Sequence, residues 1–524
     1  MQLKKLIQNY SNFILVSLLA GFSFLINFNY GFIGLMPMDN TVLFNGGFRV
    51  LNGYVPFSDY WLVTGPLLDY LNAFFFKILG LSWKTFIIHS SLINLLLAVT
   101  SFYFFINLEV PKIFSFFYSL LISILFYPVV GTPFVDHHST FFLVLSFYFL
   151  IISIKYSKYN YFFFIPSILL LSFLSKQTPA VYGIISITIL VLFLYYIEKQ
   201  LFKKIVLNSI LGIFISLTLF LFFFLVSKIE INNFILQYLF FASSIGGDRL
   251  DTYHFNLFNE LDNYKFIYFF VFLLAFLILK IVRDKIQDKK NLFVIICSIT
   301  LSLVLIFHQM ITLNQNFIFF IIPFLCGVFH SFYQKIYDRK IFLFIPILIC
   351  IFSVTKYHLR FNEERKFNEL EKVDISKAVD AEVLDSKLKG LKWITYLNPE
   401  NPYKEINDIR EILRILKDEG SSKMIITEYQ IIAPILGVYD NSPNQWHHPS
   451  VSFPLNKNKY FELYKDFFVS KVKKYKINFI FETRSDNNTI TELVLSPECY
   501  FSKKERISNM LIRLKINKNC EDFK

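Results

Sequence analysis

The stretch Met36-Pro-Met-Asp39-Asn-Thr41, with its continuation to Asp59-Tyr-Trp-Leu-Val-Thr-Gly-Pro66, differs in character from the sequence around it. It contains acids, an arginine, glycines and prolines, whereas the segments on both sides are long apolar runs. Polar residues confined to short stretches of a membrane protein tend to mark the path of a substrate. The fold prediction is therefore built outward from this stretch, which separates the first apolar run from all later ones.

The composition is typical of a membrane protein, since 55% of the 524 residues are hydrophobic and 19% are aromatic. A run of about 20 apolar residues is long enough for a helix to cross a bilayer. Apolar runs occur at about 12–32, 85–107, 112–130, 139–154, 161–174, 179–197, 205–227, 264–281, 292–307, 317–334 and 341–355. We therefore predict a polytopic α-helical membrane protein with about eleven transmembrane helices. Run 161–174 is short, and together with 179–197 it is also compatible with a re-entrant pair.

The basic residues predict the orientation of these helices. The formal net charge of +13 is compatible with nucleic-acid binding, but the lysines and arginines lie between apolar runs and in the tail. Every second connection is basic, as at Lys155 and Lys158 after the fourth run and Lys203 and Lys204 after the sixth. Cytoplasmic loops carry such an excess. We expect membrane lipids and no nucleic acid as partners, and a cytoplasmic N-terminus.

The sequence changes character after residue 355. Residues 356–524 are polar, with apolar runs typical of buried strands at 423–428 and 477–482 and helical spacing between them. We predict a membrane domain over 1–355, in which 34–84 form the first outer loop with interfacial helices. A small outward-facing α/β domain follows over 356–524. Whether Cys499 and Cys520 of this domain are bridged stays open.

This orientation collects unusual polar residues on the outer face. The candidate site residues are Asp39, Arg49, Asp59, Asp136, His137, His138, Lys176, Gln177, Arg249, His308 and Gln309, with the amides of Asn314, Gln315 and Asn316 beside the last two. Several of them also have a simpler explanation. The alternatives are a solvated acid at 39, a helix cap at 136–138, a membrane-surface anchor at 176, an exposed loop arginine at 249 and turn chemistry at 308–316.

These residue types suggest particular ligands. An Asp with neighbouring His residues can bind a divalent metal, so Asp136, His137 and His138 are candidate ligands and a metal is a candidate cofactor. Lys176 and Arg249 are candidates for binding a phosphate. Neutral amides suit sugar hydroxyls, and in the tail Trp446 is a candidate for stacking on a carbohydrate.

The order of an apolar run, Asp39, Arg49-Val-Leu-Asn-Gly53-Tyr-Val-Pro56-Phe-Ser-Asp59 and Gly65-Pro66 resembles that of the GT-C glycosyltransferases. It is most similar to the bacterial branch that contains protein O-mannosyltransferases and lipid A aminoarabinose transferases. Members carry an acid in a long first outer loop and use sugars linked to polyprenyl phosphate. Many have two adjacent acids there, whereas this sequence has Asp39-Asn40. The resemblance implies a glycosyltransferase of the bacterial inner membrane, with a periplasmic C-terminal domain and a lipid, glycan or protein acceptor.

The chemistry of such a transfer assigns roles to the candidates. Polyprenyl phosphate is a good leaving group, so the reaction mainly needs a base for the acceptor hydroxyl and a positive charge for the phosphate. We expect Asp39 to be the base, Asp136 and His137 to belong to the same catalytic site, and Asp39 and Asp136 to lie about a sugar's width apart. The expected substrate-binding residues are Arg49, Asp59, Lys176, Gln177, Arg249, His308 and Gln309.

Two other functions are compatible with a polytopic chain. A transporter or flippase of lipid-linked sugars needs polar residues deep within its spans. A non-catalytic envelope scaffold is the other possibility, but that function does not explain the acids of the first loop. The polar residues gather at one face, which favours the enzyme.

Overall fold

The computed structural model describes residues 2–197, 199, 201–283, 289–312, 318–337, 340–420, 422–483, 489–500 and 505–523. The predicted amides at 314–316 lie outside these residues. The chain divides into two compact units, the first made of Met1–Gly31, Ile87–Phe223 and Arg249–Phe367, and the second of Phe32–Phe86, Phe224–Asp248 and Asn368–Lys524. The predicted boundary at residue 355 divides the chain by surroundings, membrane or water, and not by compact units. This predicted division into two domains stays a prediction.

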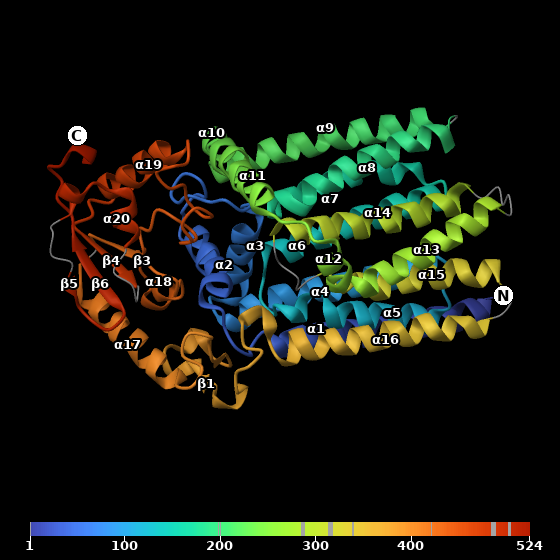
Figure 1. Ribbon diagram of the computed structural model, residues 1–524, viewed down its shortest axis with the longest axis horizontal. Coiled ribbons are helices and arrows are strands. Elements are labelled where there is room, and N and C mark those ends of the chain that lie inside the picture. The colour runs from blue at the N-terminus through green and yellow to red at the C-terminus, as the bar shows by residue number, and fades with distance from the viewer. Residues whose placement is uncertain are drawn as a thin grey trace. The chain divides into compact units, whose positions relative to one another are not determined.

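The first unit is built from long helices that run alongside one another (Figure 1). They are α1 (Gln2–Tyr30), α4 (Trp83–Asn107), α5 (Lys112–Leu125), α6 (Val135–Lys155), α7 (Ile165–Ser175), α8 (Gln177–Ile197), α9 (Phe202–Ser227), α13 (Lys265–Arg283), α14 (Lys289–Thr312), α15 (Ile321–Ile336) and α16 (Phe344–His358). Within the described ranges, nine of the chain's helices are long and apolar enough to cross a membrane. Every predicted apolar run coincides with a helix, although α7 and α15 are shorter than a full crossing, at 11 and 16 residues.

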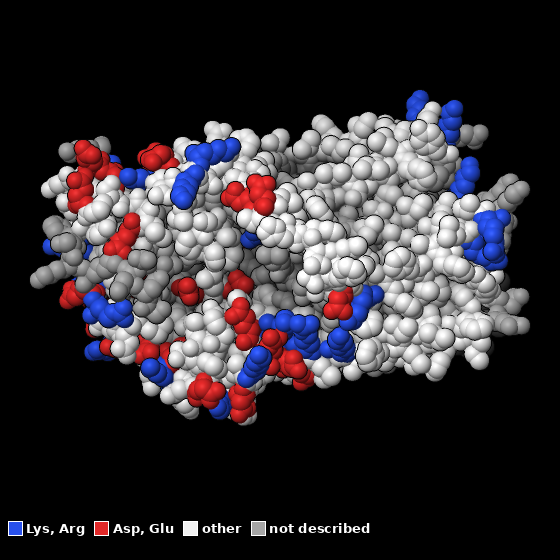
Figure 2. Space-filling model, in the orientation of Figure 1, with Lys and Arg blue, Asp and Glu red and all other residues white. Residues whose placement is uncertain are grey.

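The helices of this unit differ in how much of their surface other helices cover. In α6, 78% of the most apolar stretch is buried, whereas in α9 only 17% is. An apolar helix that is exposed on most sides requires lipid around it. Figure 2 agrees, since the surface over these helices is largely uncharged, and Lys and Arg gather at the end where α8 meets α9 and α13 meets α14. The predicted class, a polytopic α-helical membrane protein, is confirmed.

Buried amides hold several of these helices together. The Asn94 amide in α4 donates to Ser23 O in α1 at 2.8 Å and to Ser123 O in α5 at 3.0 Å. The Asn27 amide in α1 donates to both Ser90 and Ser91 of α4. Hydrogen bonds of this kind stabilise helix contacts where no water is available.

The second unit combines helices with a small sheet. Its longer helices are α2 (Pro37–Leu51), α3 (Leu67–Leu79), α17 (Pro402–Asp418) and α19 (Phe461–Lys474), and the short ones are α10 (Ile231–Phe234), α18 (Ile432–Leu436) and α20 (Ile490–Val494). Two further helices, α11 (Ala242–Thr252) and α12 (Leu257–Asn263), follow α10 along the chain. The four-stranded sheet has the order β3 (Lys423–Ile426), β4 (Phe479–Thr483), β6 (Leu511–Lys515), β5 (Glu505–Arg506), and β1 (Val379–Asp380) pairs with β2 (Lys392–Trp393). The strands predicted near 423 and 477 are therefore confirmed as β3 and β4, which run parallel with α19 between them in the sequence.

Helix α2 packs closely on α3. Its first turn contains Pro37, and the Met36 N–H donates to the Asn40 side chain at 2.7 Å, which satisfies one free donor of the helix start. At Gly46 a Cβ atom would lie 2.1 Å from Oδ1 of Asp69 in α3, so no larger residue fits without movement. The first loop thus has a tightly packed structure of its own.

A disulfide joins Cys499 and Cys520 in the second unit, with their Cα atoms 5.1 Å apart. This settles the question that the sequence left open. The remaining cysteines, Cys297, Cys326 and Cys350, are buried as free thiols in α14, α15 and α16.

Candidate active site

A pocket with a volume of about 430 Å³ opens in the second unit at the first turn of α2. Its lining residues come from both ends of this unit's sequence and are Met36, Met38, Asp39, Tyr396, Glu428, Trp446, His447, His448 and Pro449. The volume is in the range of small-molecule binding sites. The pocket brings the predicted base, Asp39, together with a second carboxylate and two aromatic rings.

The two carboxylates of the pocket lie on segments that are bonded to each other. Asp39 is half-buried in the first turn of α2, where the helix dipole favours a negative charge. Glu428 lies two residues after the end of β3 and is also half-buried. The Thr41 hydroxyl accepts from the Gln430 N–H at 3.1 Å, and its oxygen contacts Glu428 O at 3.3 Å. These bonds fix the segment after β3 against the start of α2.

The third wall of the pocket, residues 446–449, is held through Gln445. The Gln445 amide nitrogen donates to Oδ1 of Asp69 at 2.7 Å, and its backbone carbonyl accepts from Gln430 Nε2 at 2.9 Å. The neighbouring Trp446 lines the pocket, and its indole N–H has no hydrogen-bond partner among the described residues. This wall therefore presents an aromatic ring to the pocket.

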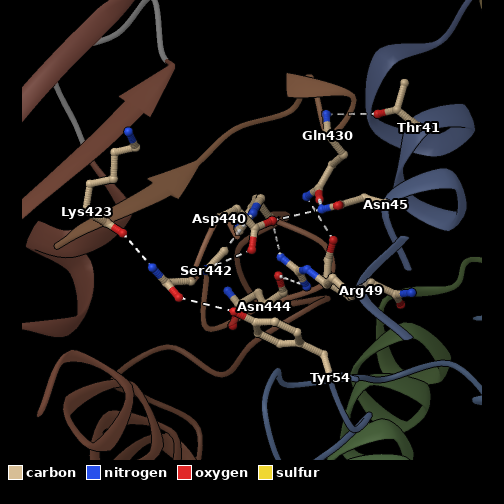
Figure 3. Close-up of polar contacts among 12 residues, drawn as sticks. Thr41, Asn45, Arg49, Tyr54, Lys423, Gln430, Asp440, Ser442 and Asn444 are labelled. Carbon is tan, nitrogen blue, oxygen red and sulfur yellow. Dashed lines mark hydrogen bonds and ion pairs between the residues drawn. The ribbon is translucent and has the colours of Figure 1, made fainter. Parts of the chain in front are cut away.

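Arg49, at the other end of α2, is enclosed in a buried polar cluster that Figure 3 shows. Its Nη2 lies 2.6 Å from Oδ2 of Asp440, and its Nη1 donates to Asn444 O at 2.9 Å. Asn45 donates to the same Asp440 oxygen at 2.8 Å. Burial opposes the charge, but the Asp440 carboxylate outweighs it and raises the pKa of the Arg49 guanidinium. Arg49 thus anchors the 440–444 segment and does not line the pocket, and its predicted contact with substrate stays a prediction.

The other acids of the first loop also have partners within the second unit. Asp59 accepts from the Val55 N–H at 2.8 Å and from Lys474 Nζ at 2.6 Å. Burial acts to raise the pKa of Asp59, but these bonds prevail and lower it. Asp69 is fully buried, and burial raises its pKa to about 7 although Tyr60 and Gln445 donate to it. The predicted role of Asp59 in substrate binding stays a prediction.

Asp136, Lys176 and His308 meet in the first unit, where the α6 start, the α7–α8 connection and the α14 end converge. Lys176 Nζ lies 2.7 Å and 2.8 Å from the two carboxylate oxygens of Asp136, and His308 Nε2 lies 2.9 Å from Oδ1. Asp136 is 2% exposed, while the Lys176 side chain is 20% exposed. The structure therefore brings together three of the residues that the sequence singled out.

The histidines beside Asp136 point to other partners. His137 Nε2 contacts Phe126 O at 3.1 Å, and His138 bonds to His89 Nε2 at 3.0 Å and to the Tyr127 hydroxyl. Asp136 itself is occupied by Lys176 and His308. In the part of the chain that the structure describes, no three His, Cys, Asp or Glu residues are arranged to hold a metal ion. The candidate ligands Asp136, His137 and His138 therefore do not fit a shared metal site.

Three more predicted residues lie around this cluster or act on it. Gln177 follows Lys176 at the start of α8. Arg249 in α11 is close enough for its charge to act on His308, and its guanidinium forms no ion pair within the described ranges. Gln309 is 1% exposed, and both atoms of its amide lack a hydrogen-bond partner among the described residues. The first unit thus contains, near His308, a cation and a buried amide that have no ion-pair or hydrogen-bond partner among the described residues.

The sequence analysis missed Glu428 and Tyr396 of the pocket. A signal for Glu428 was present, because it ends the run that predicts β3, and ligands bind outside the carboxyl ends of parallel strands. Tyr396 follows β2 and carries no comparable signal. The predicted proximity of Asp39 and Asp136 stays a prediction, because the two residues belong to different compact units.

A comparison with solved structures identifies a shared fold. The structure of ArnT from Cupriavidus metallidurans bound to undecaprenyl phosphate matches with a TM-score of 0.52, covering 96% of this chain and 97% of that chain. The sequence identity is 9%, so the likeness shows the fold alone. No protein-family model and no curated protein sequence matches the chain. The GT-C-like fold expected from the resemblance is confirmed.

Proposed function

We propose that this chain is a membrane glycosyltransferase that transfers a sugar from a polyprenyl-phosphate donor to a hydroxyl group, with Asp39 as the general base. The acceptor is a lipid, a glycan or a protein, and the reaction takes place at the outer face of a bacterial inner membrane. The observation that carries the proposal is the position of Asp39 in a pocket with a second carboxylate and aromatic rings. A fold shared along 96% of the chain with a protein crystallised with undecaprenyl phosphate supports the choice of donor.

The proposed reaction needs one proton transfer. Asp39 accepts the proton of the acceptor hydroxyl while the hydroxyl oxygen attacks the anomeric carbon of the sugar. The bond from that carbon to the phosphate oxygen breaks, and polyprenyl phosphate leaves with the electron pair. Such general-base assistance typically contributes about 10²–10⁴-fold to the rate.

The departing phosphate needs positive charge and hydrogen-bond donors. Arg249 and Lys176 supply the charge, and the Gln309 amide, which lacks a partner among the described residues, supplies a donor. Asp136 holds Lys176 in place through the bonds described above, and His308 holds Asp136. In this proposal they position the lysine rather than contact the sugar, and no step is assigned to a metal.

Two observations support the proposed orientation. Disulfides such as Cys499–Cys520 form and persist in oxidising compartments, which favours a periplasmic C-terminal segment. The basic residues at one end of the first unit favour a cytoplasmic side there. A reporter fused to the C-terminus should be active in the periplasm, and activity in the cytoplasm alone would overturn the orientation.

The function is tested with purified protein and a panel of undecaprenyl-phosphate sugars, with membrane extract as the source of acceptors. We expect release of undecaprenyl phosphate with at least one donor, dependent on the extract. Donor movement across vesicles without cleavage would indicate the transporter instead. If the folded protein released no undecaprenyl phosphate from any donor, the glycosyltransferase proposal would be rejected.

A further inference from the structure

We infer that the pocket at Asp39 is a saccharide-binding subsite for the acceptor, in which Glu428 and Trp446 bind an uncharged sugar or an amino sugar. The inference rests on the proposed function in one respect, namely that Asp39 is the base. It adds the class of the acceptor and two residues from the C-terminal segment that contact it.

The charge of the pocket selects its ligand. Burial raises the pKa of the Tyr396 phenol, and the negative charges of Glu428, Glu369 and Asp39 raise it further. Several carboxylates thus surround this ring, and two of them line the pocket. Like charges repel, so a phosphorylated or carboxylated ligand is disfavoured here. Hydroxyl and ammonium groups are favoured, because each can donate to a carboxylate.

The remaining lining matches a sugar ring. Met36, Met38 and Pro449 provide apolar surface, and Trp446 provides an aromatic ring. A sugar has an apolar face of C–H groups and a rim of hydroxyls, so it can use both kinds of wall.

The two carboxylates favour a polyhydroxylated acceptor over a peptide. A serine or threonine side chain presents a single hydroxyl, so it can reach only one of the two carboxylates that line the pocket. A saccharide presents several hydroxyls, so one can react at Asp39 while another donates to Glu428. The Thr41 contacts with the Glu428 backbone carbonyl and the Gln430 N–H hold the backbone that carries this second carboxylate before a ligand arrives.

The distribution of tryptophans provides a direct test. The chain has four, and three of them, Trp61, Trp83 and Trp393, are at most 1% exposed, whereas Trp446 lines the pocket. The full-length protein in detergent is titrated, without any donor, with methyl glucoside, methyl mannoside, glucosamine and glucose phosphate, and tryptophan fluorescence is recorded. We expect a saturable change with at least one of the first three sugars, and at least about 10-fold weaker binding of glucose phosphate.

Variants assign the signal to the pocket. Trp446→Phe should abolish the fluorescence change while leaving the thermal unfolding curve unaltered. Glu428→Gln should weaken sugar binding by at least about 10-fold, because it loses a hydrogen bond to a charged group. Glu462→Gln is the matched control, since Glu462 is an exposed carboxylate on α19 outside the pocket.

Three results would overturn the inference: no saturable change with any sugar, wild-type affinity in Glu428→Gln, or tightest binding of glucose phosphate. The titration uses no donor, so its outcome is independent of transfer. Sugar binding without any transfer would remove the proposed function and keep the subsite. Transfer together with wild-type sugar affinity in Glu428→Gln would remove the subsite and keep the function.

Discussion

The two ends of helix α2 each carry a charged side chain, and the two side chains have different surroundings. At the start of the helix, Asp39 is half-buried and faces a cavity of about 430 Å³. At the end, Arg49 is 3% exposed, and Asp440 neutralises its charge at 2.6 Å. A side chain that the fold encloses, such as Arg49, contributes to structure, whereas a side chain that lines a cavity, such as Asp39, can be reached by a substrate. Position in an unusual polar loop does not by itself separate the two cases.

The largest effect is expected at the cavity end. Asp39→Asn keeps the size of the side chain but cannot accept a proton, so the turnover of transfer should fall about 10²–10⁴-fold. Donor affinity and thermal unfolding should change little. Glu462→Gln is the control, because Glu462 is an exposed carboxylate on α19 outside the pocket. Near-normal transfer by folded Asp39→Asn would show that Asp39 is not the base.

The opposite outcome is expected at the buried end. Arg49→Met leaves Asp440 buried without its cation, which typically costs about 3–5 kcal/mol of stability. Thermal or denaturant unfolding in detergent measures this loss, and a double variant with Asp440→Leu should recover part of it. If Arg49→Met kept its stability and lost donor binding, Arg49 would be a substrate contact and the contrast between the two ends of α2 would be wrong.

Asp69, beneath the middle of α2, predicts a pH dependence. Burial raises its pKa to about 7, against about 3.9 in an unfolded chain. Between these values the folded state holds a proton that the unfolded state has lost. Stability therefore falls as pH rises from about 4 to about 7, by roughly 4 kcal/mol at most.

Unfolding midpoints measured across this pH range test the sign of the effect. Asp69→Asn should flatten this part of the profile and should equal or exceed the wild-type stability at pH 7. A wild-type profile that rises over this window, and that Asp69→Asn lowers, would mean that Asp69 is ionised in the folded protein.

The smallest effect is expected for the ion pair of Asp59 and Lys474. The Lys474 side chain is 55% exposed, and pairs of this kind contribute about 0–1 kcal/mol. Lys474→Ala should therefore shift the unfolding midpoint only slightly and leave transfer unchanged. A strong loss of transfer would indicate that Asp59 acts on the substrate, as the sequence analysis expected.

The parts of the fold that the sequence predicted depend on local patterns. Apolar runs such as 139–154 mark helices because a spanning helix needs only its own residues to satisfy its backbone. The apolar runs at 423–428 and 477–482 likewise indicated β3 and β4, although the strands need partners to satisfy their backbone. The partners of the polar residues could not be predicted from the sequence. Arg49 and Asp440, for example, lie at opposite ends of the sequence, and no local pattern connects them.

The candidate site was predicted in part for the same reason. Asp39 was found because it is a lone acid beside an apolar run, and Lys176 and His308 because charge and imidazole are unusual at the end of a span. The sequence did not show that Lys176 and His308 both bind Asp136. Because Asp136 and His137 are adjacent, they suggested a common ligand, but in the structure they contact different partners. The sequence analysis assigned Glu428 to a strand and gave it no role in the site. Its position after the end of β3 indicates a ligand site only once β4 is known to run parallel to β3.

The pocket is formed by segments that are synthesised at different times. Asp39 is made 389 residues before Glu428, and Trp446 follows Glu428. At about 5–20 residues per second, roughly 20 to 80 s separate the synthesis of Asp39 from that of Glu428. Nascent chains and truncated products can therefore insert their spans in the membrane while lacking a formed pocket. A product that ends before Glu428 lacks two walls of the pocket, so the proposed catalytic site forms only after this segment has been made.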